Sequence, residues 1–524
     1  MRQSEITAGD STRRDNRWIY QILLFSLVTL ITRLPFRSSY LFDHDSVQFA
    51  LGMRQYDVYL HHPHPPGYFL YIQTAKLIDY FVRDANASLI WLSVFASVLL
   101  VISAYSLASA LIDRRDGRWV ALLTITSPMI WFHGEVALSY IVAAFFANLM
   151  GLIAWQLMQG DRRWLYLSPV ALGVAAGFRQ DLILFLGPLW FFAVARFGWR
   201  ATLSVLAILA ATVLSWFVPM VRATGGLGRY LTALNELWAF NNDPQSIWQT
   251  TTSSPADTFW TLMGFLSYGV ELGALFLLVS AYLLLRTGAW RDIAGEKICF
   301  FLLWLAPALI FFSFVFIPPY KYAYGLVVVP VFVILIPSAV RLVSVATGKL
   351  IIFGKHPVHP APYLILPALV VINILIFSLG SNGYSVGGLR HHEQLLTTII
   401  SGIRANFPTD GTVILGRQRS TFSGFRHIQY YLPEYSVYLA DQQTDRDGQQ
   451  WHVFGALKGQ TFLSRSLTIP QDTRYIVFVA DPYFPETSRD LEQPEIRRIQ
   501  LTSDYALYYK ELPRPTPANS TVSR

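Results

Sequence analysis

Long apolar stretches separated by short polar connections dominate the chain up to about residue 380. A transmembrane helix needs about 17–25 predominantly apolar residues. Eleven stretches are candidates, of which three (119–133, 164–178 and 182–197) are short: 18–36, 88–112, 119–133, 138–159, 164–178, 182–197, 201–221, 259–285, 298–317, 323–340 and 362–380. The pattern predicts a polytopic α-helical membrane protein with about eleven transmembrane helices.

Basic residues gather in every second connection between these stretches. They are Arg114, Arg115 and Arg118; Arg162 and Arg163; Arg196 and Arg200; Arg286, Arg291 and Lys297; and Arg341, Lys349 and Lys355. Cytoplasmic loops carry an excess of Lys and Arg. The alternation therefore places the polar N-terminal tail, residues 1–17, in the cytoplasm, and the first connection, residues 37–87, outside it.

The segment Gly67–Phe81 decides this orientation. Counting it as a span would reverse every later loop and place the arginine clusters outside. It is short, and Gln73, Lys76 and Asp79 interrupt it. We therefore expect an amphipathic helix that lies along the outer membrane surface, with a second one over Ser46–Tyr56.

The composition changes after the last apolar stretch. Strands are predicted at 412–415, 435–438, 475–479 and 506–509, and a helix at 395–407 that ends before Pro408. We expect a membrane domain over 18–384, a small extracytoplasmic α/β domain over 385–512, and a disordered tail over 513–524.

Composition excludes several classes of protein. The chain of 524 residues is 53% hydrophobic and only 14% charged, whereas soluble domains carry about 25% charged residues. Its net charge of +8 is assigned to the cytoplasmic loops and not to nucleic-acid binding. The single cysteine, Cys299, excludes an internal disulfide and a cysteine-based metal cluster.

Two carboxylates, Asp43 and Asp45, stand in the first outside connection. Ionisable groups close to hydrocarbon are costly and are a mark of function. A carboxylate here could accept the proton of an attacking hydroxyl. Alternatively, Asp45 could cap the helix that follows it.

Three histidines, His61, His62 and His64, follow in the same connection. An Asp-x-Asp pair with nearby histidines could bind a divalent metal ion. Proline at 63, 65 and 66 is expected to hold this segment extended, which opposes convergence of three ligands. His64 could instead donate to a phosphate oxygen, and Pro65-Pro66-Gly67 is expected to form a rigid corner that opens the surface helix.

These motifs resemble the GT-C superfamily of polyprenyl-phosphate-sugar-dependent glycosyltransferases, which includes protein O-mannosyltransferases and the lipid A aminoarabinose transferase. Asp45-Ser-Val-Gln-Phe49 is similar to the family's Asp-Glu-x-x-Tyr/Phe motif, with serine in place of the Glu. His64-Pro-Pro-Gly-Tyr68 is similar to its His-Pro-Pro-Gly form. The resemblance implies that Asp45 is the catalytic carboxylate, with Asp43 as the neighbouring alternative, and that His64 and Tyr68 contact substrate.

Three further polar residues at expected outer turns are candidates for substrate binding. Lys321 and Arg179 could hold the phosphate of a lipid carrier, and Glu135 occupies a place where some relatives have an active-site acid. Each could instead be a snorkelling side chain or a member of a local ion pair; Arg179 has Asp181 beside it.

The sequence thus predicts a bacterial inner-membrane enzyme that transfers a sugar, with inversion, from a polyprenyl phosphate to a lipid, glycan or protein acceptor on the periplasmic side. The lipid-linked sugar is the donor, no metal ligand is assigned, and a divalent ion is kept as an optional cofactor. One alternative is a flippase for a lipid-linked saccharide, although such transporters often show internal repeats and none is visible here. The other is a non-catalytic scaffold whose outer domain binds a partner.

Overall fold

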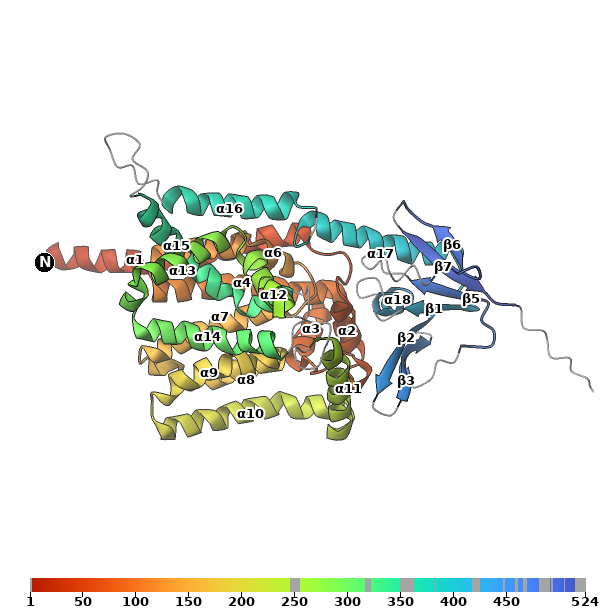
Figure 1. Cartoon of the computed structure of the whole chain (residues 1–524). Helices are drawn as coiled ribbons and strands as arrows, with labels where there is room; N and C mark the ends of the chain where they lie inside the picture. Colours follow the sequence, from red (N-terminus) through yellow and green to blue (C-terminus); the bar gives the residue numbers. More distant parts are fainter. Residues whose placement is uncertain are drawn as a thin grey trace, which may run out of the picture. The chain divides into compact units, whose positions relative to one another are not determined.

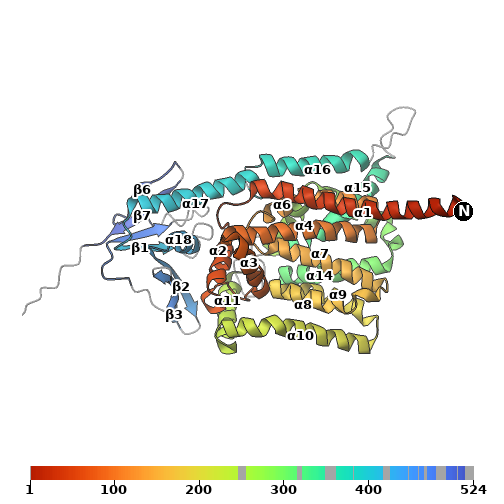
Figure 2. The ribbon, with the colours of Figure 1, turned by 180° about the vertical axis from the view of Figure 1, so that it is seen from behind.

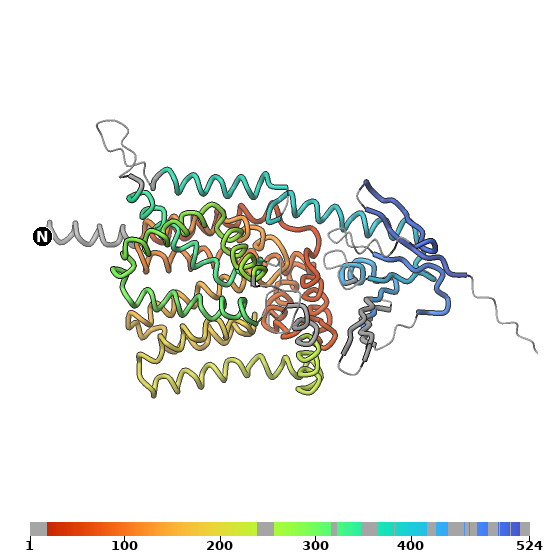
Figure 3. Tube along the Cα trace, viewed as in Figure 1, coloured from red at the N-terminus to blue at the C-terminus, as the bar shows by residue number. Residues whose placement is uncertain are grey.

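The computed structural model of the chain describes residues 2–245, 255–315, 322–348, 362–381, 383–416, 425–445, 448–457, 460–464, 469–479, 491, 493–503 and 505–513. The chain forms two compact units. Met1–Arg37 and Pro65–Leu389 make one, here named the helical unit, and Ser38–His64 and Arg390–Arg524 make the other, the sheet unit. The path of the chain through each unit can be followed in Figure 3.

Long helices that lie side by side build the helical unit, as Figures 1 and 2 show from opposite directions. Its helices are α1 (Arg2–Arg33), α3 (Phe69–Val82), α4 (Ala85–Leu111), α5 (Arg114–Thr126), α6 (Pro128–His133), α7 (Tyr140–Met158), α8 (Leu167–Phe178), α9 (Asp181–Ala195), α10 (Trp199–Ala223), α11 (Leu227–Gln245), α12 (Pro255–Val270), α13 (Gly273–Thr287), α14 (Gly295–Phe314), α15 (Val329–Gly348) and α16 (Pro362–Leu379). Short 3-10 turns are η1 (Leu34–Phe36), η3 (Arg162–Trp164), η4 (Ala289–Asp292) and η5 (Tyr322–Val327).

Six helices of the described residues are long and apolar enough to cross a membrane: α1, α4, α7, α10, α14 and α15. The helices α12 and α13 qualify together, although the chain bends by 115° between them. Three shorter apolar helices are α8, α9 and α16, and the stretch 119–133 is divided between α5 and α6 at Pro128. The predicted polytopic helical fold is confirmed, whereas the predicted count of eleven spans stays a prediction.

Both helices expected in the first connection are present. One is α3, and the other is α2 (His44–Arg54) of the sheet unit. The helix α3 begins at Phe69 and not at the prolines, because Tyr68 at its N-cap adopts a left-handed conformation with φ of 46°. It packs against α4, α8 and α10.

A mixed seven-stranded sheet with the order β4-β3-β2-β1-β5-β7-β6 forms the centre of the sheet unit. Its strands are β1 (Thr412–Gly416), β2 (Ser436–Asp445), β3 (Gly448–Leu457), β4 (Gln460–Ser464), β5 (Tyr475–Val479), β6 (Arg497–Gln500) and β7 (Ala506–Glu511). The strand β1 pairs in parallel with β2 and β5, and the outer pairs are antiparallel. The predicted C-terminal α/β domain is confirmed, with β3, β4 and β6 added.

Two helices cover this sheet: α17 (Val386–Asn406), which begins in the helical unit, and α18 (Phe425–Tyr431). Ile399 and Ile403 of α17 share one apolar core with Ile428 of α18 and with Val437 and Val477 of the sheet. The short helix α18 forms the connection between the parallel strands β1 and β2, as such a pair requires a crossover.

The first connection, predicted at residues 37–87, is divided between the two compact units. Ser38–His64, which includes α2 and the turn η2 (Val58–Leu60), packs with the C-terminal residues, and only Pro65 onward belongs to the helical unit. The physical reason is a set of hydrogen bonds between residues more than 350 positions apart, such as Leu41 with His427. Sequence patterns do not reveal pairs of this kind.

A close contact between α7 and α14 gives a test of the packing. A Cβ atom at Gly151 would lie 2.6 Å from Cη2 of Trp304, which is 1% exposed. We expect Gly151→Ala to lower the free energy of unfolding by about 1–3 kcal/mol, because overpacking a filled core forces neighbours to shift. Gly187→Ala, where a Cβ meets nothing within 4 Å, is the control. Thermal unfolding in detergent measures both, and equal midpoints would contradict the packing.

Candidate active site

The carboxylate of Asp43 caps the helix α2. Its Oδ1 accepts a hydrogen bond from the backbone N–H of Asp45 at 2.9 Å. In return, Oγ of Ser46 accepts one from the backbone N–H of Asp43 at 3.1 Å, which completes a capping box. Such a box satisfies N–H groups that the first helical turn leaves without partners. The capping role that the sequence offered to Asp45 is thus performed by Asp43.

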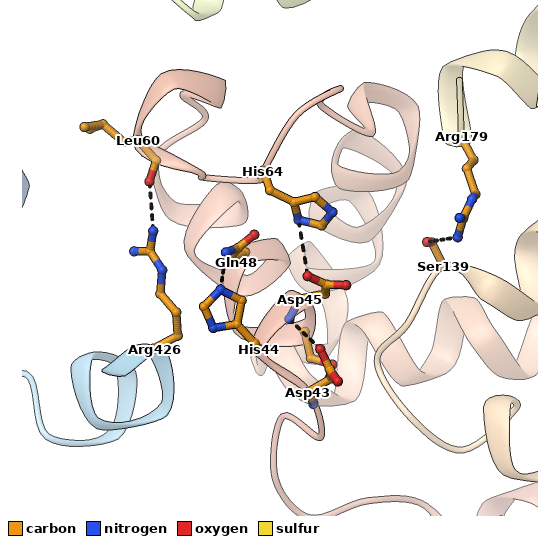
Figure 4. A network of polar contacts seen from close by, with 10 residues as sticks. Asp43, His44, Asp45, Gln48, Leu60, His64, Ser139, Arg179 and Arg426 are labelled. Atoms are coloured by element: carbon orange, nitrogen blue, oxygen red, sulfur yellow. Dashed lines mark hydrogen bonds and ion pairs between the residues drawn. The ribbon is translucent and has the colours of Figure 1, made fainter. Parts of the chain in front are cut away.

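Asp45 lies in the first turn of α2 and faces His64 (Figure 4). Its Oδ1 is 3.6 Å from Nδ1 of His64, and the two side chains are 19% and 15% exposed. The ring of His64 also contacts the ring of Phe49, with centroids 5.7 Å apart. Asp45 and Phe49 are four residues apart and share one face of the helix, so the histidine covers both residues of the motif.

A tight turn returns the chain to α2 and so places His64 there. The backbones of Asp57 and His62 form an antiparallel bridge with N–O distances of 2.7 and 2.9 Å, and His61 between them is left-handed with φ of 55°. A Cβ atom at Gly52 of α2 would lie 3.0 Å from Pro63. The bridge keeps His62 extended, as expected for a residue before proline, and the left-handed residue His61 closes the turn ahead of it.

The arrangement suits proton transfer better than metal binding. Among the residues that the structure describes, no three His, Cys, Asp or Glu side chains converge on a point that could hold a metal ion. A carboxylate beside an imidazole, both partly accessible, can accept a proton and share it. Asp43, Asp45 and His64 lie close together within the sheet unit. Asp43 caps the first turn of α2, and the carboxylate of Asp45 in that turn faces His64.

Arg179 and Tyr68, two other predicted binding residues, come together within the helical unit. Arg179 ends α8, is 6% exposed, and donates from Nε to Asp181 at 2.9 Å and from Nη1 to Ser139 at 3.4 Å. It also interacts electrostatically with the phenol of Tyr68. The guanidinium is thus held in place by partners on three segments of the unit.

Two aromatic rings that the sequence did not single out flank this guanidinium. Its Cζ lies 4.8 Å from the ring centre of Tyr140 and 5.2 Å from that of Tyr324. A small, partly open pocket adjoins it. Its lining consists of Tyr140, Ala143, Arg179, Asp181, Leu182, Phe185, Phe312, Ala323, Tyr324 and Val327. A charged pair thus borders an otherwise apolar pocket, an arrangement suited to an amphiphilic ligand.

Glu135 lies in the interior of the helical unit and not in the lining of this pocket. It is fully buried, and its Oε1 accepts from Nε1 of Trp131 at 2.7 Å. Arg33 of α1, also fully buried, stacks over the Trp131 ring at 4.9 Å and interacts electrostatically with Glu135. The carboxylate therefore compensates a buried cation, as buried charges require. Lys321, the remaining predicted binding residue, lies outside the described residues.

Fold and site together define a multi-pass membrane protein with a polar, acid-bearing loop after its first helix. Comparison with solved structures identifies the fold. The chain is similar to ArnT from Cupriavidus metallidurans bound to undecaprenyl phosphate, with a TM-score of 0.55, 14% sequence identity, and coverage of 94% of this chain and 97% of that one. Apo ArnT gives a TM-score of 0.52 at 14% identity, with coverage of 95% and 98%. The chain therefore has the fold of ArnT, a transferase that the resemblance of the motifs had pointed to.

No family model and no curated protein sequence matches this chain. The archaeal oligosaccharyltransferase AglB from Archaeoglobus fulgidus, in complex with an inhibitory peptide and a dolichol-phosphate, is matched with a TM-score of 0.39 at 11% identity, over 87% of this chain and 75% of that one. The likeness to ArnT alone therefore assigns the fold.

Two buried histidines of the sheet unit make a testable pH dependence. Burial, helped by the charge of Arg426, lowers the pKa of His62 to about 3. Burial, helped by His392, lowers the pKa of His427 to about 3. Both stay neutral in the folded protein at pH values where the unfolded chain, with a pKa near 6.5, already binds protons. Stability is therefore complete above pH 6.5 and is lost as the pH falls toward 3.

We expect each of these histidines to cost about 1.4 kcal/mol of unfolding free energy per pH unit below 6.5. Denaturant unfolding of the sheet unit in the full chain at pH 7 and pH 5 measures the loss. His62→Gln and His427→Gln should each reduce the slope, since glutamine does not titrate. A stability that is equal at the two pH values would show that these histidines are accessible to protons in the folded state.

Proposed function

We propose that the protein is a membrane glycosyltransferase that moves a sugar from a polyprenyl phosphate to an acceptor outside the cytoplasm. The observation that carries the proposal is the pair formed by Asp45 of α2 and His64, with Oδ1 and Nδ1 3.6 Å apart, in a chain with the fold of ArnT. ArnT of Cupriavidus metallidurans binds undecaprenyl phosphate, which supports a lipid-phosphate donor for this chain. The arginine-rich alternate connections support a bacterial inner membrane with the sheet unit on the periplasmic side.

In the proposed reaction Asp45 is the general base. Its carboxylate takes the proton of the acceptor hydroxyl while that oxygen attacks the anomeric carbon of the sugar. The bond from that carbon to the phosphate oxygen breaks, the carrier phosphate leaves with the electron pair, and the configuration inverts. His64 is placed to orient the carboxylate and to share its proton. Asp43 keeps the first turn of α2 in position through its capping bond.

Arg179 and its pocket support binding of the carrier. A guanidinium is a strong partner for a phosphate oxygen, and the small pocket beside it is lined by apolar residues such as Leu182, Phe185 and Phe312. Tyr68 is close enough to Arg179 to take part. Lys321 is proposed as a second cation for the phosphate.

Removal of the base is the first test. We expect Asp45→Asn to lower kcat about 10²–10⁴-fold, the usual contribution of a general base, in a transfer assay with labelled undecaprenyl-phosphate sugars and purified protein. Asp43→Asn should retain kcat within about tenfold, because Asn is an equally good N-cap. Transfer that survives Asp45→Asn and is lost in Asp43→Asn would assign the base to Asp43. Wild-type protein that moves the lipid across a vesicle without transfer would indicate a flippase, and protein that does neither would be a scaffold.

Removal of the buried arginine is the second test. We expect Arg179→Met to weaken binding of undecaprenyl phosphate about 10–100-fold, since a hydrogen bond to a charged group is worth about 1.5–3 kcal/mol. Arg163→Met is the matched control, because Arg163 also pairs with an aspartate two positions away but its side chain is 87% exposed. Binding is measured by titration of the lipid in detergent. Equal affinity in the two variants would remove Arg179 from the carrier site.

A further inference from the structure

The loop that bears the proposed base is bonded to α18 at its N-terminal end. Leu41, two residues before Asp43, is fully buried. Its backbone N–H donates to Oη of Tyr431 at 2.8 Å, and its carbonyl oxygen lies 2.9 Å from Nε2 of His427. Both hydrogen-bonding groups of one residue are therefore fixed by side chains of a helix about 390 positions later in the chain.

The other end of the loop is bonded to the same helix. Arg426 donates from Nη2 to the carbonyl oxygen of Leu60 at 3.2 Å. Nε2 of His62 lies 3.0 Å from Oγ1 of Thr461, which in turn accepts from Nε2 of Gln429 at 2.5 Å. These contacts fix the turn immediately before His64. Asp45 and His64 thus each come shortly after a residue that α18 or the neighbouring strand β4 holds in place by hydrogen bonds.

The residues that make these contacts are unusually costly to bury. Arg426 is 2% exposed and His427 is fully buried. Burial lowers the pKa of Arg426 to about 9, so that it remains a cation at neutral pH. A buried polar group is tolerated only where hydrogen bonds compensate its desolvation. An apolar side chain would fill the same space without fixing the direction of the Leu60 and Leu41 carbonyls.

We propose that Arg426 and His427 are positioning residues for the reaction: α18 sets the distance between Asp45 and His64 by fixing the chain before each of them. The inference rests on the proposed function. Neither residue is assigned a contact with substrate. Their effect is on the geometry of the base, where a displacement of about 1 Å can cost about 10²-fold in rate.

The test measures His427→Ala and Arg426→Met beside two comparison variants, the conservative change His427→Gln and the control Arg404→Leu. We expect kcat to fall about 10–100-fold in both, with KM for the lipid-linked donor nearly unchanged. His427→Gln, which keeps a donor toward Leu41, should restore kcat to within about threefold of wild type. The matched control is Arg404→Leu: Arg404 donates to the Tyr431 carbonyl and to Glu434, so it contacts the end of α18 but not the loop.

Amide hydrogen exchange gives a readout that does not require transferase activity. In His427→Ala the amides of α2, residues 44–54, should exchange faster, while those of α4 and α7 keep the wild-type rates. If the wild-type protein shows no transferase activity, the proposed function is overturned. Amide hydrogen exchange would still test whether α18 positions α2. Unchanged kcat together with unchanged exchange in α2, or an equal loss in Arg404→Leu, would overturn the inference. If a buried variant does not fold, Thr461→Ala, which removes the contacts of this hydroxyl to His62 and Gln429 and leaves Arg426 and His427 in place, answers the same question.

Discussion

The hydrogen bonds between the Ser38–His64 loop and α18 are the interaction on which the proposed site depends. The loop has one regular helix, α2, and its remaining backbone needs partners elsewhere. His427 and Tyr431 satisfy both groups of Leu41, and Arg426 satisfies the carbonyl of Leu60. Buried backbone groups without partners are costly, so these bonds hold the loop as well as direct it. The carboxylate can be presented in one position because the chain on either side of it is fixed.

Charge compensation follows the same rule throughout the described part of the helical unit. Arg33 meets Glu135 and the Trp131 ring, and Arg179 meets Asp181 and two tyrosine rings. The first group is closed, because both charged side chains are fully buried. The second borders a pocket. This difference in access, and not a difference in the chemistry of the pairs, makes Arg179 the better candidate for a ligand contact.

Patterns that act over a few residues could be predicted from the sequence. The length of the apolar stretches located the long helices, short runs of β-branched and aromatic residues located β1, β2, β5 and β7, and the interval from Asp45 to Phe49 matched a known motif. Features that depend on distant partners could not be predicted. The use of α18 requires contacts between residues 366 positions apart, such as Arg426 and Leu60, which no local pattern encodes. A sequence clue to α18 existed nevertheless: Arg426-His427 stand together in a short segment between two predicted strands.

Ser46 shows how the start of α2 is held without the second acid of the motif that this segment resembles. It stands where the motif has its second acid, and that position is the third residue of α2. A glutamate there would normally reach back to the backbone N–H of the capping residue. Oγ of Ser46 accepts that same N–H from Asp43. The substitution therefore preserves the start of the helix and removes only a negative charge beside Asp45. In the proposed site the partner of Asp45 is His64 and not a second carboxylate. The turn that returns the chain to α2 sets the position of this histidine, so the proposed reaction depends on that turn.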